Sequence, residues 1–505
     1  MNYLFTHCKL VLALLLLVAT VPATANNIQV DSISLTGQNT TANFTMVEFD
    51  LAWDNSWRLP ANTAPGNWDA AWVFVKYAVD SVANTIWRHA TLNFVDGAND
   101  GHSVPAGVTV TTPSDGMGVF LHRSAAGSGS NDWDNIQLRW NYGTDTVSDD
   151  AIVSVKVFAI EMVYVPEGAY TIGDGAGSGF GRVHINTGNA ATLPAGAGGP
   201  QMIPQGGHPA EAVTPPATNF PNGFGDFYCM KYEGSQDQYA QFLNTLPIGQ
   251  SNTRNLNNYN VNRNTINRVL TPGNFFPTFT VDVPDNAANF LAWDDAAAYM
   301  DWAGLRPMTE MEYEKACRGT RQAFPNEFAW GTPGIFSTAY TLGSALTPAE
   351  IVTNPATGPF LGNCSWLSTD GTIDGPLRCG IFSASVTPAN RVEAGATFYG
   401  IMEMSGNVWE RVIDVTDPIA TTFTGAHGDG RLATNGNANV ATWPAVGGAA
   451  GTGSRGGSWN TPNFGGPPPP GPVPNNFMQI SDRQGMFADP NASNEYGFRA
   501  VRTAP

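Results

Sequence analysis

The C-terminal two thirds of the chain are characterised by one stretch, Gly400-Ile-Met-Glu-Met-Ser-Gly-Asn-Val-Trp-Glu410. Gly406 and Asn407 favour a turn with positive φ, which a β-branched pair could not adopt. Such a turn lets the carbonyls of Gly406 and Val408 converge with the carboxylates of Glu403 and Glu410. Two acids and two carbonyls supply the oxygen ligands that a hard cation prefers.

Five further motifs surround this stretch in a fixed order. They are Glu161-Met-Val-Tyr-Val-Pro-Glu-Gly-Ala-Tyr-Thr-Ile-Gly173, Phe227-Tyr-Cys-Met-Lys-Tyr-Glu233, Arg306-Pro-Met-Thr-Glu-Met-Glu-Tyr-Glu314, Arg455-Gly-Gly-Ser-Trp459 and Tyr496-Gly-Phe-Arg-Ala-Val-Arg502. Together the six motifs resemble the formylglycine-generating enzyme (sulfatase-modifying factor) family, whose domain is an elaborated C-type-lectin-like fold. Over residues 161–505 the resemblance implies an α+β domain with few helices and long loops.

Three short helices are predicted within this region from their start and stop signals. They begin at Ser235, Asp294 and Thr309, where capping residues precede apolar positions at helical spacing, and the last two end before Gly304 and Gly319. The segments 173–218 and 465–474 are rich in Gly, Ala and Pro without a hydrophobic period, so we expect loops there.

The resemblance implies two structural calcium sites. The first would use Glu403, Gly406, Val408 and Glu410, with Glu403 at a position where the family usually has Asn or Asp. The second would use Asn363, the carbonyl of Cys364, Asp374 and the carbonyl of Pro376, with Asp370 as a nearby substitute. In the alternative interpretation of the second site, Asp374 and Gly375 form only a turn.

The resemblance also provides a test for catalysis. Family members that oxidise a substrate cysteine use two cysteines between the Gly-Gly-Ser motif and the closing Gly-Phe-Arg motif, where thiolates bind copper. Here Trp459 is followed by Asn460 and Thr461, and no cysteine occurs after Cys379. The histidines are widely spaced, without the pattern of an iron site. We therefore expect neither copper nor iron.

Residues 26–160 have a different pattern. Val47, Phe49, Leu51 and Trp53 alternate with polar residues, and three later segments repeat this period of two, which predicts an antiparallel β-sandwich. The many tryptophans of this region have two interpretations: most of them fill the sandwich core, or they form a platform on which a sugar stacks.

The first 25 residues have the features of a secretory signal peptide. Lys9 precedes an apolar run of about twelve residues, too short to span a membrane, and small residues follow it up to Ala25. We therefore expect an exported protein, secreted or held at the cell surface or in the periplasm, without a transmembrane segment. Four cysteines would remain after cleavage, and in an oxidising compartment they would form disulfides. Of three possible pairings, we favour Cys229 with Cys317 and Cys364 with Cys379.

The composition narrows the range of partners. The chain has 42 acidic and 24 basic residues, a net charge of −18, and its five lysines are scattered singly. Because nucleic acids and anionic membranes are bound by clustered Lys and Arg, neither is an expected partner.

These observations predict an exported, non-catalytic binding or surface-structural protein whose lectin-like domain presents loops to a glycan, to a protein or to another copy of the chain. The alternative is an enzyme of the same superfamily that uses residues other than cysteine around the family's cleft. The residues that would line this cleft are Trp409, Arg455, Ser458, Trp459, Asp482 and Arg483.

Overall fold

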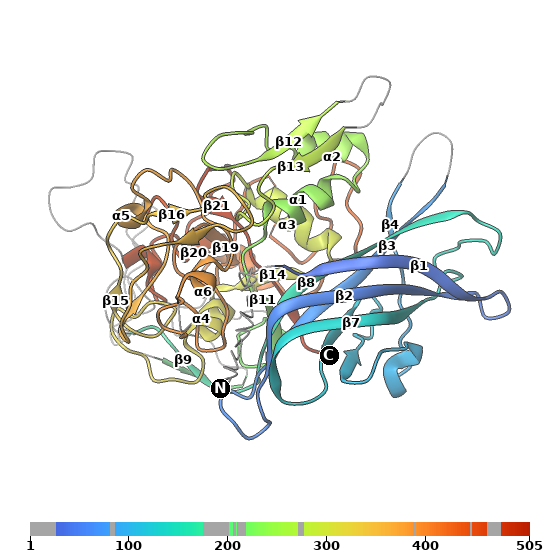
Figure 1. Cartoon of the computed structure of the whole chain (residues 1–505), viewed down its shortest axis with the longest axis horizontal. Coiled ribbons are helices and arrows are strands. Elements are labelled where there is room, and N and C mark those ends of the chain that lie inside the picture. Colours follow the sequence, from blue (N-terminus) through green and yellow to red (C-terminus); the bar gives the residue numbers. More distant parts are fainter. Residues whose placement is uncertain are drawn as a thin grey trace, which may run out of the picture.

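The computed structural model describes residues 27–80, 86–174, 201–205, 209, 219–270, 277–386, 390–444, 447–461 and 476–505. The expected signal peptide (1–25), the loop 465–474 and most of the loop 173–218 lie outside these ranges. Few helices, many short strands and long connections make up the described part, which confirms the α+β class (Figure 1). None of its helices is long and apolar enough to cross a membrane.

The N-terminal region folds into a sandwich, as the period of two predicts. A three-stranded sheet in the order β1-β2-β7 packs against strands of a larger sheet, and Val47, Phe49, Leu51 and Trp53 of β2 are buried between them. The strands are β1 (Gln29–Asn39), β2 (Phe44–Arg58), β3 (Asp69–Val79), β4 (Arg88–His89), β5 (Val108–Thr111), β6 (Val119–Arg123), β7 (Gly127–Trp140) and β8 (Val153–Val165), with a 3-10 turn η1 (Ala98–Gly101).

The larger sheet does not end with the sandwich. Its order is β20-β19-β14-β22-β11-β8-β3-β6-β5, with β21 beside β19 and β4 beside β3, so strands of both halves of the chain form one sheet of eleven strands. Strand β8 pairs with β3 along Val153–Val163 and with β11 along Met162–Val165. The expected boundary between residues 160 and 161 therefore lies inside a strand that belongs to both halves (Figure 1).

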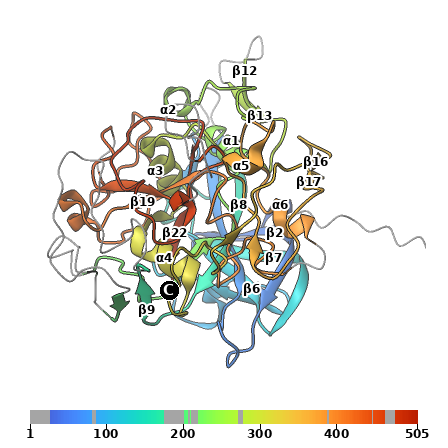
Figure 2. The ribbon, with the colours of Figure 1, turned by 90° about the vertical axis from the view of Figure 1, so that its left-hand side faces the viewer.

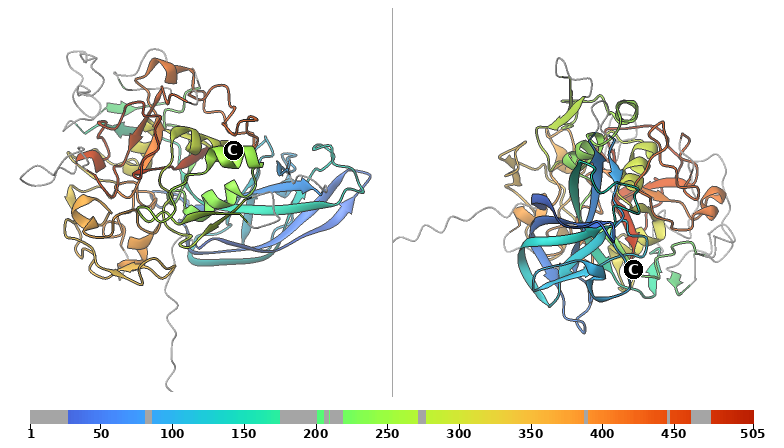
Figure 3. Two further views of the ribbon diagram at one scale, coloured as in Figure 1. Left: turned by 90° about the horizontal axis from the view of Figure 1, so that it is seen from above. Right: turned by 90° about the vertical axis from the view of Figure 1, so that its right-hand side faces the viewer.

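Strand β3 shows how closely the two halves are joined. Its odd-numbered residues, including Val73 and Val75, face the sandwich core, whereas Trp72 and Phe74 face a second core formed with helices of the C-terminal half. Lys76 is buried and donates hydrogen bonds to the carbonyls of Trp302 (2.6 Å) and Gly430 (2.9 Å). Figure 3 shows the sandwich strands extending as a long lobe from the loop-rich body.

The C-terminal half consists of short elements around the rest of this sheet. Its strands are β9 (Tyr170–Ile172), β10 (Gln201–Ile203), β11 (Phe227–Met230), β12 (Ile266–Val269), β13 (Thr278–Val281), β14 (Arg306–Thr309), β15 (Gly334–Ile335), β16 (Leu342–Gly343), β17 (Ile351–Val352), β18 (Leu361–Gly362), β19 (Trp409–Ile413), β20 (Thr452–Arg455), β21 (Tyr496–Gly497) and β22 (Ala500–Thr503). The helices are α1 (Gln236–Leu243), α2 (Ile248–Arg254), α3 (Trp293–Trp302), α4 (Glu310–Arg318), α5 (Leu367–Asp370) and α6 (Ile381–Ser385), with 3-10 turns η2 (Pro418–Thr422) and η3 (Asn476–Met478).

The three predicted helices are present as α1, α3 and α4. Ser235 caps α1 and Thr309 caps α4, each in a reciprocal pair with the residue three positions on, and α4 ends at Gly319 with φ of 65°. The start of α3 differs from the expectation, because its N-cap is Ala292 and the Asp295 carboxylate accepts the Ala292 N–H. Helix α4 lies beside β9 (Figure 2). It carries Glu310 and Glu314, two acids of the buried network of ion pairs described below.

Candidate functional site

The turn at Gly406 and Asn407 forms as predicted, with φ of 88° and 66°. A Cβ at position 406 would lie 2.4 Å from the Ser365 carbonyl oxygen, so only glycine fits. The buried carboxylate of Glu233 holds the turn, because it accepts hydrogen bonds from the Asn407 side chain (2.5 Å) and the Val408 N–H (3.0 Å). Glu233 was not expected at this site from the sequence, although it closes the motif Phe227–Glu233.

Glu403 and Glu410 lie buried beside this turn. Glu403 accepts the Gly380 N–H through Oε1 (2.8 Å), and Glu410 pairs with Arg499 through Oε1 (2.7 Å). The Oε2 atom of each is buried and has no hydrogen-bond partner in the described part of the chain. Burial raises the pKa of Glu403 to about 7, and burial also raises the pKa of Glu410, against the effect of Arg499.

A third buried carboxyl group, that of Glu233, belongs to this cluster. Its pKa is raised well above the usual range, first by burial and then by Glu403 and Glu410. Two unpartnered carboxylate oxygens beside the carbonyl-bearing turn fit a hard cation. Among the described residues, no three side chains of His, Cys, Asp or Glu could hold a metal by themselves, so the backbone carbonyls of Gly406 and Val408 would have to complete the site.

The oxygen atoms expected to bind the second calcium ion accept hydrogen bonds from other groups of the chain. Asn363 Oδ1 accepts from the Ala356 N–H (2.8 Å), and the Cys364 carbonyl accepts from Thr369 (3.1 Å). In the same way, the Pro376 carbonyl accepts from Arg263 (2.8 Å) and Asp374 from Asn262 (3.1 Å). Asp370 accepts the Asp374 N–H (3.2 Å). Each of these five residues therefore accepts a hydrogen bond within the chain, as in a turn.

Two arginines of the expected cleft lie in a buried network of ion pairs. Arg455 contacts Glu314 (2.9 Å) and Glu310 (3.3 Å) of α4, and Arg483 contacts Glu310 (2.7 Å) and Asp414 (3.1 Å). The side chains of both arginines are at most 3% exposed. The network extends along α4, where Arg318 pairs with Glu314 and Glu327. The ion pairs of Arg455 and Arg483 therefore hold the segments that carry these two arginines against α4.

The other cleft residues are also engaged. Asp482 accepts from the backbone and side chain of Gln484 (2.9 and 2.8 Å). Ser458 Oγ donates to Glu495 (2.5 Å), and the Trp459 indole donates to the Asn494 carbonyl (3.0 Å). Of the six cleft residues, only Trp409 is not fully buried. The structure thus brings the six together around β19 and β20 as a packed region.

The expected disulfides are wrong, because all four cysteines are free and buried thiols. Cys229 and Cys317 share one hydrophobic cluster, whereas Cys364 and Cys379 lie in two different clusters. Burial raises the pKa of all four thiols, so each remains protonated at neutral pH. The even number of cysteines suggested pairing, but these side chains act as small apolar groups in the core.

The fold and the turn around Gly406 define a protein of the sulfatase-modifying factor type. Residues 159–504 match the family described as "Sulfatase-modifying factor enzyme 1-like domain", and the chain belongs to this family.

Three relatives illustrate the range of similar proteins. The formylglycine-generating enzyme of Thermomonospora curvata is 27% identical over 144 residues, 26% of this chain and 35% of the relative. The hercynine oxygenase of Mycobacterium tuberculosis is 38% identical over 82 residues (15% and 18%), and the formylglycine-generating enzyme of Bos taurus is 46% identical over 48 residues (10% and 12%). The matched stretches span about a third or less of each relative.

Proposed function

We propose that this chain is an exported, non-catalytic member of its family that binds a ligand or partner at the cell exterior. The observation that carries the proposal is the state of the thiols. The sequence has no cysteine after Cys379, and the four cysteines of the C-terminal half, Cys379 included, are buried with raised pKa values. A thiol that remains protonated in an apolar core is a poor nucleophile and a poor ligand for a soft metal.

The expected cleft supports the same proposal. Arg455 and Arg483, which could stabilise a developing negative charge in an enzyme, are instead neutralised by Glu310, Glu314 and Asp414 inside the protein. A buried pair with such partners cannot turn toward a substrate without leaving carboxylates uncompensated, which would be costly. The side chains around the cleft therefore stabilise the domain, and exposed loops or the sandwich are left to bind ligands.

A structural calcium ion is part of the proposal. Glu403 and Glu410 would hold it together with the carbonyls of Gly406 and Val408, and the ion would compensate the charge of the buried acids. The unpartnered Oε2 atoms of the two acids support this assignment. Millimolar calcium outside the cell would fill even a weak site of this kind.

The second candidate function is an enzyme of the same superfamily, which the names of the relatives favour. The two candidates are separated by incubating the chain from residue 26 onward with copper and a cysteine-containing peptide while oxygen is measured. The proposed function predicts no oxygen uptake above that of copper and peptide alone, together with binding to at least one glycan or protein ligand. Oxygen uptake that requires the protein would establish the enzyme instead.

A further inference from the structure

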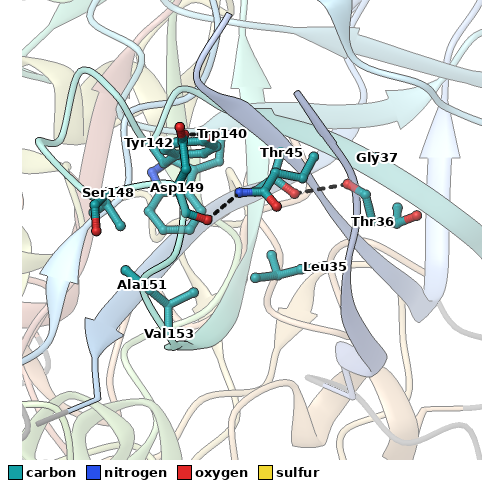
Figure 4. Close-up of a pocket in the computed structure, with 12 residues that line it drawn as sticks. Leu35, Thr36, Gly37, Thr45, Trp140, Tyr142, Ser148, Asp149, Ala151 and Val153 are labelled. Atoms are coloured by element: carbon teal, nitrogen blue, oxygen red, sulfur yellow. Dashed lines mark hydrogen bonds between the residues drawn. The ribbon is translucent and has the colours of Figure 1, made fainter. Parts of the chain in front are cut away.

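A cavity of about 290 Å³ lies in the sandwich, far in sequence from the family's cleft. One wall is formed by residues 35–38 of β1, and the opposite wall by residues 147–153, which lead into β8 (Figure 4). Trp140 and Tyr142 lie at its base. This volume is at the lower limit of small-molecule pockets, which measure about 300 to 1,000 Å³, so the cavity can hold at most a single small ring.

The base of the cavity is rigid and aromatic. The Trp140 indole donates to Asp145 (2.6 Å), which fixes the ring, and the Tyr142 ring lies edge-on to it at 6.2 Å. Trp140 is 1% exposed and Tyr142 is 3% exposed, so both rings also belong to the sandwich core. The interpretation of the tryptophans as core residues is thus correct for Trp140, and the same residue still contributes to the surface of a pocket.

The rim of the cavity is polar, and hydrogen bonds fix the orientation of two of its residues. Tyr142 donates to Asp149 Oδ1 (2.7 Å), and Gln38 Nε2 donates to the Asp149 carbonyl (2.8 Å). Asp149 and Gln38 are exposed, so the second carboxylate oxygen of Asp149 and the amide oxygen of Gln38 can be reached by a ligand. The Ser148 hydroxyl lies on the same rim. The exposed rim therefore offers several acceptors to a ligand that carries hydroxyl groups.

From this arrangement we propose that the cavity binds one neutral hexose ring, as a sugar or as the end of a glycan. The apolar C–H face of the ring packs on Leu35 and Val153 above the aromatic base, while neighbouring hydroxyls donate to Asp149 and Gln38. No cationic side chain lines the cavity, and the chain has a net charge of −18, which disfavours an acidic sugar. This site deepens the proposed function, because it names the glycan as its ligand.

The test uses the whole mature chain and three single variants. Asp149→Asn and Gln38→Ala change exposed rim residues, and Asp150→Asn removes the same charge from the adjacent exposed residue, which does not line the cavity. A glycan array first identifies neutral sugars that bind, and titration calorimetry then measures Kd for the best of them. Asp149→Asn should weaken binding about tenfold or more, because a hydrogen bond to a charged group is lost, whereas Asp150→Asn should bind like the wild type.

Three results would overturn the proposal: no neutral sugar binds, acidic glycans bind in preference, or Asp149→Asn and Gln38→Ala bind as well as the wild type. The last result leaves glycan binding in place but moves it to another part of the protein. Thiol-dependent oxygen uptake is measured separately, so failure of the non-catalytic function and failure of this sugar site can be told apart.

Discussion

Arg455 and Glu314 form an ion pair of 2.9 Å whose two side chains have no solvent exposure. Arg455 belongs to the Arg-Gly-Gly-Ser-Trp motif, whereas Glu314 lies on α4. The pair joins β20, at one end of the eleven-stranded sheet, to this helix, and Glu310 and Arg483 extend the network of ion pairs. A motif that resembles part of a catalytic cleft thus has a structural role in this chain.

Removal of Arg455 should destabilise the fold strongly. Arg455→Leu leaves Glu310 and Glu314 buried with less compensation, and breaking a buried pair costs about 3–5 kcal/mol. Arg431→Leu, which changes an exposed arginine, is the control and should alter the free energy of unfolding by less than about 1 kcal/mol. Chemical denaturation measures both, and equal effects of the two variants would contradict the structural role.

The shared sheet predicts that the chain unfolds as one unit. Trp72 and Phe74 of β3 pack into the core of the C-terminal half, and β8 pairs with strands of both halves. Calorimetry should therefore show one transition, and Trp72→Ala should lower its midpoint, since loss of a buried Trp costs about 3–5 kcal/mol. Two separate transitions, with only one shifted by the substitution, would show that the halves fold independently.

Asp414 should make stability depend on pH. Burial, together with Glu310, raises its pKa from 3.8 to about 7, so between these values the folded state holds a proton that the unfolded state has released. The free energy of unfolding therefore falls as pH rises through this window. Buried His122, whose pKa is lowered to about 4, acts in the opposite direction below its usual 6.5. The difference in the free energy of unfolding between the wild type and Asp414→Asn, measured as a function of pH, isolates the contribution of Asp414. If the two pH profiles are parallel, Asp414 makes no such contribution.

Calcium should stabilise the protein if Glu403 and Glu410 bind it. A cation that binds only the folded state adds RT ln(1 + [L]/Kd) to stability, so a chelator should lower the melting temperature. Glu403→Gln should remove most of that shift, whereas Asp374→Asn should retain it, because Asp374 is hydrogen-bonded to Asn262 and is not a ligand of the first site. An unchanged melt in chelator, with no metal found by elemental analysis, would remove the calcium proposal.

The reaction of the chain with a thiol reagent tests whether the four cysteines are free and buried. The native chain from residue 26 onward should not react with a thiol reagent within minutes, because Cys229, Cys317, Cys364 and Cys379 are buried. Four equivalents should react after denaturation without a reductant. If reaction appeared only after reduction, the cysteines would be paired after all.

Local signals in the sequence were sufficient for some features. The pairs Ser235 with Gln238 and Thr309 with Glu312 lie within one helical turn, so their capping role could be predicted. Gly406 and Asn407 specify their turn by backbone preference alone. The alternation in β2 predicts which of its residues enter the sandwich core.

Features that depend on distant contacts could not be predicted in this way. Glu233 reaches Asn407 across 174 positions, and Arg455 reaches Glu314 across 141. Nothing in the pattern of β8 indicates that it pairs with β3 on one edge and with β11 on the other. The partner of a buried charge and the neighbours of a strand are set by tertiary packing, on which a single sequence carries no local signal.

The proposal that the chain does not oxidise thiols is tested most directly by oxygen uptake with a cysteine-containing peptide, after the chain has been loaded with copper and dialysed. The burial of all four thiols and the lack of any cysteine after Cys379 predict no retained copper, no uptake above the protein-free control and no aldehyde in the peptide. Copper bound in a fixed ratio, with protein-dependent uptake and an aldehyde product, would contradict the non-catalytic function.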